Sequence, residues 1–262
     1  MNRCSTALLT TIFFVLATLG LGRAYAQTGF LDRAIVTGQQ IYRYQVFVPN
    51  GYREDKEWPV VLFLHGAGER GQDGMKPTQV GLGAAIRNYP ERFPTIVMFP
   101  QMLSGRNWEN EETQALIYEE LMQTQKEFHV DLSRLYLTGL SMGGQGILEI
   151  IRRHSKTFAA AVVISSEMVP VNEFWASEIY GKPAPDIPYT NAAHALSDVP
   201  LWIFHGDLDY EVPQQRMERL LAAVKKEGGM ARYTEYGGAD HRIWDRVYSD
   251  PDLWVWLFAQ HR

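Results

Sequence analysis

Short apolar runs alternate with amphipathic segments along most of the chain. Runs with the β-branched and aromatic content of strands occupy residues 41–48, 60–64, 96–99, 134–138, 160–164, 201–204 and 232–236. Helices are expected between and after them, at residues 113–128, 146–153, 213–226 and 252–259. Several runs are apolar without a break, as strands covered on both faces are. The pattern predicts an α/β fold with a mostly parallel central sheet and helices on both faces.

One segment lacks this alternation of apolar runs and amphipathic segments. Residues 167–199 contain Pro170, Pro183, Pro185 and Pro188 and show no clear period. Long irregular segments inside a compact domain are usually functional or mobile. We therefore expect an inserted flap over the site at about residues 167–199, and a solvated surface loop is the alternative.

The N-terminus has the layout of a secretory signal peptide. Arg3 gives a positive start, residues 7–22 are apolar, and Ala24-Tyr25-Ala26 offers an A-x-A cleavage site. The apolar run is broken by threonines and is shorter than the roughly 20 residues that a membrane-spanning helix needs. We expect residues 1–26 to be removed on export, leaving a periplasmic or extracellular domain at residues 27–262.

Composition and charge narrow the kinds of partner. Hydrophobic residues make up 46% and charged residues 21%, which is ordinary for a globular protein with a core. The single cysteine, Cys4, lies in the expected signal peptide, so the mature chain must be stabilised by its core and not by disulfides. The mature chain keeps 23 of 25 basic groups and all 30 acidic ones, a formal charge of −7, without a basic run. Nucleic acid and anionic membrane surfaces are therefore not expected partners.

A nucleophile motif lies between a predicted strand and a predicted helix. Residues 139–143, Gly-Leu-Ser-Met-Gly, fit G-x-S-x-G in the strand–turn–helix context that this motif requires. A sharp turn lifts Ser141 above the sheet edge, and the N-terminus of the following helix favours developing negative charge. Ser141 is the predicted nucleophile, and a glycine-rich turn with a buried serine is the alternative.

The base that activates a serine should be a histidine late in the chain. His241 follows a predicted strand in a glycine-containing turn, ahead of the final helix, and fits the order serine, acid, histidine. The other histidines are assigned to the surface (His129, His154, His194 and His261) or to packing at strand ends (His65 and His205).

The acid that orients the histidine has several candidates. Asp209 lies in the loop at residues 205–213, after a buried strand and before a helix. Asp207 lies in the same loop, and Glu167 also follows a buried strand, so spacing alone leaves Asp209 only slightly ahead. Asp240 is more simply interpreted as a solvated turn residue.

An oxyanion hole needs backbone N–H groups directed at the reacting carbonyl oxygen. One comes from the residue after the nucleophile, here Met142. The other comes from a loop after an early strand, here residues 65–71, with Ala67 as the expected donor and Gly68 as the alternative.

Three further side chains are considered as contacts for the substrate. Gln101, Trp108 and Trp175 are candidates for lining a substrate pocket, and ordinary packing is the alternative for each. No cluster of residues has the spacing of a metal site, and no nucleotide-binding motif is present, so neither a metal nor a cofactor is expected.

Together these motifs resemble a known group of enzymes. The chain is similar to the bacterial carboxylesterases often labelled predicted peptidase or phospholipase/carboxylesterase. These are related to dienelactone hydrolase, to polyhydroxybutyrate-depolymerase-like, feruloyl and acetylxylan esterases, and more distantly to prolyl oligopeptidase. The matching blocks are residues 62–71, 99–101 with Trp108, 136–144, 202–206 with Asp209, Val212 and Pro213, 232–236, and His241 with Trp244.

The resemblance implies an α/β-hydrolase fold and a role for each site residue. The family pattern of Gly, two residues, Asp, two residues, Val-Pro places the acid on Asp209, and the family histidine falls on His241. The implied reaction is hydrolysis of small or carbohydrate-linked carboxylic esters through an acyl-enzyme on Ser141. A serine peptidase and a non-catalytic binding protein on the same scaffold are the alternatives.

Two departures from the family pattern bear on the substrate. Arg242 stands where such proteins usually have Asp or Asn, and the segment at residues 167–199 is longer than usual. The substrate of the relatives therefore does not carry over to this chain.

We expect the exported protein to begin at Gln27, because the A-x-A sequence ends at Ala26. An intact-mass measurement on protein recovered from the periplasm or the medium checks this. Protein that stays in the membrane with Met1 in place would contradict it.

Overall fold

The computed structural model describes residues 27–167 and 187–262. The expected signal peptide, Trp175 and residues 168–186 of the expected flap lie outside the described residues.

The core of the molecule is one eight-stranded sheet in the order β1-β2-β4-β3-β5-β6-β7-β8. Strands β3 to β8 run parallel to one another, and β2 is antiparallel to both of its neighbours, β1 and β4. The strands are β1 Gly29–Thr37, β2 Gln40–Val48, β3 Trp58–Leu64, β4 Ile96–Pro100, β5 Val130–Leu140, β6 Ala160–Ile164, β7 Leu201–Gly206 and β8 Ala231–Tyr236.

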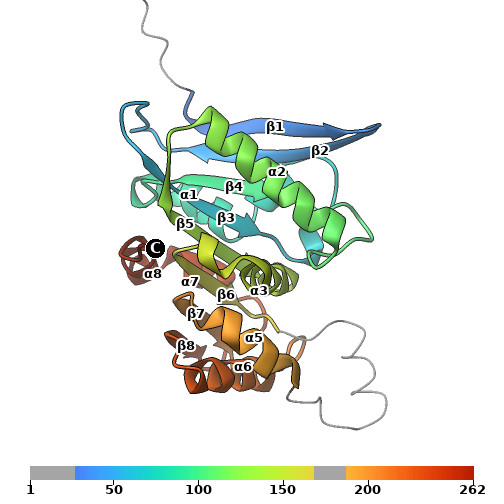
Figure 1. The fold of residues 1–262 in the computed structure, drawn as a ribbon, viewed down its shortest axis with the longest axis vertical. Coiled ribbons are helices and arrows are strands. Elements are labelled where there is room, and N and C mark those ends of the chain that lie inside the picture. The colour runs from blue at the N-terminus through green and yellow to red at the C-terminus, as the bar shows by residue number, and fades with distance from the viewer. Residues whose placement is uncertain (1–26, 168–186) are drawn as a thin grey trace, which may run out of the picture.

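Helices cover both faces of this sheet (Figure 1). Helices α2, α3, α5 and α6 pack on one face, and α1, α7 and α8 pack on the other. The helices are α1 Leu82–Asn88, α2 Glu111–Glu127, α3 Met142–His154, α5 Ile187–Leu196, α6 Gln215–Lys226, α7 Trp244–Ser249 and α8 Pro251–Phe258. Short 3₁₀ segments are η1 Ala67–Glu69, η2 Lys76–Thr78, η3 Pro90–Arg92 and η4 Ser155–Thr157.

The central strands supply both cores, which explains their unbroken apolar sequence. In β3, Val60, Leu62 and Leu64 belong to the core under α2 and α3, whereas Val61 and Phe63 belong to the core under α1 and α8. Side chains alternate between the two faces of a strand, so a strand covered on both faces must be apolar at every position. Each such side chain stabilises the fold by roughly 1.5–3 kcal/mol when it is fully buried.

The predicted strands and helices are all present, and the expected α/β architecture is confirmed. The apolar pattern does not predict β1, α1 or α7. Strand β1 lies at the edge of the sheet with most of its side chains exposed or half-buried, so its sequence carries little periodicity. Helices α1 and α7 are too short to show a clear helical period.

The expected flap at about residues 167–199 is wrong for its second half. Residues 187–196 form α5, and Ala192, Ala193 and Leu196 of this helix are buried in the core beside α3 and α6. These positions have helical spacing, which the nearby prolines obscured. Pro188 falls in the first turn of α5, where proline is compatible with a helix.

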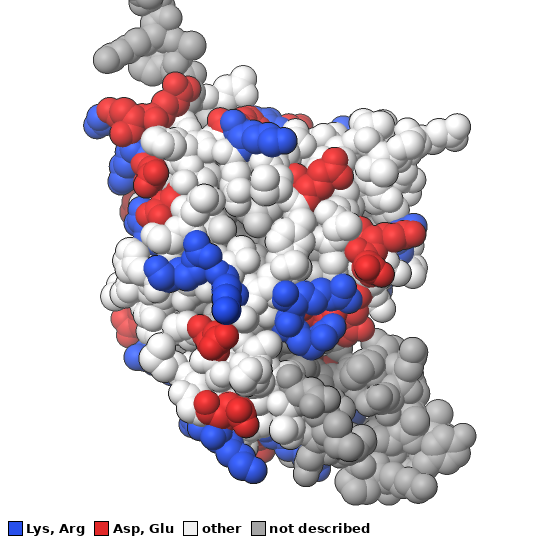
Figure 2. Space-filling model, in the orientation of Figure 1, with Lys and Arg blue, Asp and Glu red and all other residues white. Residues whose placement is uncertain are grey.

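The surface shows no concentration of positive charge on the face drawn in Figure 2, where basic and acidic side chains lie interspersed. Within residues 27–167 and 187–262, none of the helices combines the length and the apolar character needed to cross a membrane.

The parallel strands place the chemically important loops together. His65 follows β3, Ser141 follows β5, Asp209 follows β7 and His241 follows β8. The carboxyl ends of parallel strands lie at the same edge of a sheet, which is where ligands bind in open α/β folds. Residues far apart in the sequence therefore meet at one edge.

Candidate active site

The backbone at Ser141 has an unusual conformation. Ser141 has φ +51° and ψ −124°, although it is not a glycine. Such a conformation costs about 1–3 kcal/mol and persists only where the surroundings hold it. Here the Ser141 N–H donates to the carbonyl of Ile164 at 2.9 Å, and the Ser166 hydroxyl donates to the carbonyl of Ser141 at 2.7 Å.

Two glycines allow the turn to be this tight. A Cβ atom on Gly143 would lie 2.0 Å from the carbonyl oxygen of Leu64, and one on Gly139 would lie 2.5 Å from the carbonyl oxygen of Gly143. No side chain fits at these distances, so helix α3 passes against the end of β3 only because both residues are glycine. The G-x-S-x-G spacing is thus a packing requirement of the strand–turn–helix unit.

Ser141, His241 and Asp209 form a continuous hydrogen-bonded chain. His241 Nε2 lies 3.0 Å from Ser141 Oγ, and His241 Nδ1 lies 2.7 Å from Asp209 Oδ2. A carboxylate accepts and does not donate, so the ring proton is on Nδ1 and Nε2 is left to accept from the serine hydroxyl. His241 and Asp209 are buried, whereas Ser141 is half-buried and reachable.

The environment of Asp209 keeps its carboxyl group ionised. Oδ1 accepts from the backbone N–H groups of Glu211 and Val212, at 3.0 and 2.8 Å. Burial by itself raises the pKa of Asp209, but hydrogen bonds from His205, His241 and the Val212 backbone outweigh burial and lower this pKa well below its usual range. A fixed negative charge therefore lies behind His241.

The other candidate acids have different partners. Asp207 is exposed and accepts two backbone N–H groups of the turn after β8, at 2.7 and 3.3 Å. Glu167 forms an ion pair with Arg216. Asp240 is exposed and accepts a backbone N–H two residues later, at 3.0 Å. Of the candidates weighed, Asp209 is the one that the structure brings to His241.

The remaining histidines fall into the two groups that the sequence suggested. Those assigned to the surface are exposed, namely His129, His154, His194 and His261. His65 and His205 at the strand ends are fully buried. Each of these two holds a loop of the site through specific hydrogen bonds, which packing alone does not describe.

His65 fixes the loop that follows β3. Its Nε2 accepts from the Met102 N–H at 2.9 Å, so the ring proton is on Nδ1, which donates to the carbonyl of Gly66 at 2.5 Å. The Trp108 indole N–H donates to the carbonyl of His65 at 3.0 Å. Burial, opposed by the Gly66 hydrogen bond and assisted by the Arg70 guanidinium, lowers the pKa of His65 to about 4. The ring is therefore neutral at physiological pH.

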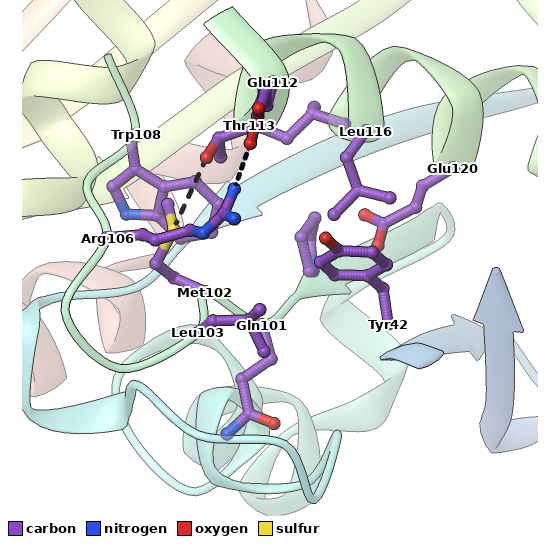
Figure 3. A pocket seen from close by; sticks show the side chains of 12 residues that line it. Tyr42, Gln101, Met102, Leu103, Arg106, Trp108, Glu112, Thr113, Leu116 and Glu120 are labelled. Carbon is purple, nitrogen blue, oxygen red and sulfur yellow. Dashed lines mark hydrogen bonds and ion pairs between the residues drawn. The ribbon is translucent and has the colours of Figure 1, made fainter. Parts of the chain in front are cut away.

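Gln101 and Trp108 occupy positions different from those expected of substrate contacts. Both are buried, at 4% and 1% exposure. Gln101 Nε2 donates to the carbonyl of Glu69 at 3.0 Å, and Oε1 accepts from the Gly74 N–H at 2.6 Å. Figure 3 shows the Gln101 amide turned away from the other lining residues of the pocket. Their polar groups thus support the loop at residues 65–74.

The pocket that Gln101 and Trp108 line is too small for an ester. Its volume is about 20 Å³, which is room for about one water molecule. The remaining lining comes mainly from α2 and from the segment after β4 (Figure 3). The expectation that these two residues contact substrate finds no support here, because backbone groups of the loop use their hydrogen-bonding capacity.

The two expected oxyanion donors lie at the starts of helical segments. Segment η1 begins at Ala67 and α3 begins at Met142. N–H groups in the first turn of a helix have no partner within it. Gly66 brings the two segments together, since a Cβ atom there would lie 3.6 Å from Ser141 Cβ. Both segments therefore begin beside the serine.

Three residues that contact the site were given no role in it from the sequence, where His205 was assigned to packing at a strand end. Ser166 bonds to the carbonyl of Ser141, His205 bonds to Asp209, and Trp244 meets the His241 ring edge-on at 5.6 Å. Ser166 and His205 lie at the carboxyl ends of β6 and β7. Their position at that edge is the signal that would have marked them.

The profile of a family described as “Putative esterase” matches residues 37–259. The chain belongs to this esterase family. The resemblance inferred from the sequence motifs is thereby confirmed.

Among curated proteins, the chain is 30% identical over 107 residues to the uncharacterized protein YfhR of Escherichia coli K12. The match covers 37% of this chain and 35% of YfhR, so it spans about a third of that relative's length.

Solved structures confirm the α/β-hydrolase fold. A thermostable esterase matches with a TM-score of 0.74 and 29% identity, over 89% of this chain and 63% of that one. A ferulic acid esterase matches with a TM-score of 0.68 and 18% identity, over 88% and 100% of the two chains. The S-formylglutathione hydrolase FrmB of Staphylococcus aureus matches with a TM-score of 0.63 and 17% identity, over 89% and 100%.

The buried ring of His65 should make the protein less stable as the pH falls. The unfolded ring takes up a proton near pH 6.5, whereas the folded ring does so only near its pKa of about 4. Between these values the unfolded state binds more protons, so the free energy of unfolding falls, by up to about 3 kcal/mol at pH 4. Denaturant unfolding at pH 7, 6, 5 and 4.5 measures the slope of the free energy of unfolding against pH.

His65→Gln should reduce the slope, because this variant has no ring to protonate. The exposed His261 provides the matched control, and His261→Gln should keep the slope of the natural protein. An unchanged slope in His65→Gln would show that His65 is not responsible.

Proposed function

We propose that this protein is an exported serine esterase that hydrolyses small or carbohydrate-linked carboxylic esters through an acyl-enzyme. The observation that carries the proposal is the chain of hydrogen bonds from Asp209 through His241 to Ser141, at 2.7 and 3.0 Å. This arrangement supplies a nucleophile, a base in the required tautomer and an ionised acid behind the base. Membership of the esterase family supports the same reaction.

In the acylation step, Ser141 Oγ attacks the carbonyl carbon of the ester while His241 Nε2 takes the hydroxyl proton. The carbonyl oxygen receives the negative charge, and the N–H groups of Ala67 and Met142 stabilise it. The bond to the alcohol then breaks, and the alcohol leaves with the proton from His241. The Asp209 carboxylate stabilises the charged ring throughout.

Deacylation repeats these steps with water as the nucleophile. His241 takes a proton from water, and the hydroxyl attacks the acyl carbon. The bond to Ser141 Oγ breaks, the serine regains its proton from His241, and the carboxylic acid departs.

The fold of the structural neighbours suggests the substrate class. A ferulic acid esterase and a further enzyme of that type share the fold at under 20% identity. Esters of aromatic acids and of sugars are therefore the first substrates to test.

Ser141→Ala should lower hydrolysis of p-nitrophenyl acetate and methyl ferulate by several orders of magnitude, because only binding and oxyanion effects remain. It should also abolish labelling by a fluorophosphonate, which reports an activated serine whatever the natural substrate. Initial rates and in-gel labelling of the purified protein measure both. Retained turnover, or an absence of label in the natural folded protein, would contradict the proposal. Faster cleavage of a peptide p-nitroanilide than of any ester would favour a peptidase instead.

A matched pair of variants tests the acid in the same assays. Asp209→Asn should favour the wrong imidazole tautomer and lower turnover by roughly 10⁴-fold. Asp207→Asn lies in the same loop but faces other backbone groups, so its rate should stay near that of the natural protein. Equal losses in the two variants would contradict the assignment of Asp209.

A further inference from the structure

A second histidine reaches the carboxylate that holds His241. His205 is the next-to-last residue of β7, and its Nε2 lies 3.1 Å from Asp209 Oδ2. The same nitrogen lies 2.8 Å from the carbonyl oxygen of Val212. The side chains of His205 and Asp209 are both fully buried. The His205 ring therefore lies inside the loop that carries the acid.

The partners of His205 define its tautomer. The carbonyl of Val212 only accepts, so the ring carries its proton on Nε2 and directs that N–H between two acceptors. Its Nδ1 is buried and has no hydrogen-bond partner among the residues that the structure describes. Leaving a buried polar atom without a partner costs folding free energy. The hydrogen bonds of the His205 ring thus go only to the loop that contains Asp209 and Val212, in the part of the chain that the structure describes.

With His205 included, the Asp209 carboxylate has four donors. Oδ1 accepts the N–H groups of Glu211 and Val212, and Oδ2 accepts His241 Nδ1 and His205 Nε2. The two backbone N–H groups hold Oδ1, and the rings of His205 and His241 hold Oδ2. The carboxylate cannot rotate without breaking at least one of these bonds. Oδ2 is therefore fixed in the direction that His241 requires.

We infer that His205 is a positioning residue for ester hydrolysis: it orients the Asp209 carboxylate and shares its charge, and acts on Ser141 only through that carboxylate. This inference rests on the proposed function. It differs from a packing role, because a residue that only stabilises the fold has no reason to depend on Asp209.

Two substitutions of His205 distinguish the effect of its N–H donor from the effect of its aromatic ring. His205→Phe keeps an aromatic ring but removes the donor, whereas His205→Gln removes the ring but keeps an N–H group near the position of Nε2. His205→Phe should lower kcat and the rate of fluorophosphonate labelling about 10- to 100-fold, the value of one hydrogen bond to a charged group, with KM unchanged. His205→Gln should recover most of this loss.

A double-mutant cycle decides whether His205 acts through Asp209. In an Asp209→Asn background, His205→Phe should change the labelling rate by less than about twofold, because the carboxylate it orients is already gone. Phe204→Leu is the matched control. Phe204 neighbours His205 on β7 and belongs to the core under α7 and α8, so this variant should lose stability without losing kcat. Thermal melts confirm that every variant is folded at the assay temperature.

The outcomes separate this inference from the proposed function. Equal losses from His205→Phe with and without Asp209, or full activity in His205→Phe, would overturn the inference. Activity retained in Ser141→Ala would overturn the proposed function itself. If Ser141→Ala and Asp209→Asn are both inactive as expected while the effects of His205→Phe and Asp209→Asn are additive, the proposed function stands and the positioning role of His205 is wrong.

Discussion

The left-handed backbone at Ser141 is the constraint on which the site depends. This conformation is unfavourable for serine, so the surrounding contacts must hold it. They come from two other strands of the sheet: the end of β3 lies against Gly143, and β6 supplies the Ile164 carbonyl and, just after it, the Ser166 hydroxyl. The stability of the central sheet is therefore what keeps the hydroxyl raised toward His241.

The charges around the serine follow from burial and hydrogen bonding. Asp209 is buried, yet its donors keep it ionised, which gives His241 a fixed anion to face. His65 is equally buried but has only neutral partners, so burial keeps its ring uncharged while it braces the loop before Ala67. These two histidines follow strands at the same edge of the sheet, and the presence or absence of a carboxylate as hydrogen-bond partner sets their different electrical environments.

Much of this arrangement could be predicted from the sequence, because the responsible signals are local. The unbroken apolar runs indicated strands covered on both faces, and the G-x-S-x-G motif indicated a tight turn that packs against neighbouring strands. The family spacing distinguished Asp209 from Asp207, which position along the chain alone did not. The structure then showed that only Asp209 of the two bonds to His241.

What the sequence did not reveal depends on contacts between distant segments. Gln101 was expected in a substrate pocket, but its amide meets backbone groups some thirty residues earlier in the chain, which no local pattern reports. The contact between His205 and Asp209 spans only four residues, but it requires the loop to fold back on the strand. Helix α5 escaped notice because its small apolar residues lie among prolines that suggested a loop.

The most direct test of the proposed mechanism is to observe the acyl group on the serine. The protein is mixed with p-nitrophenyl acetate, quenched in acid during turnover, digested and analysed by mass spectrometry. An acyl-enzyme mechanism predicts one acetyl group per chain, on the peptide that contains Ser141, appearing with the burst of p-nitrophenol and disappearing when the ester is exhausted. Turnover without any covalent adduct, or an adduct on a different residue, would contradict it.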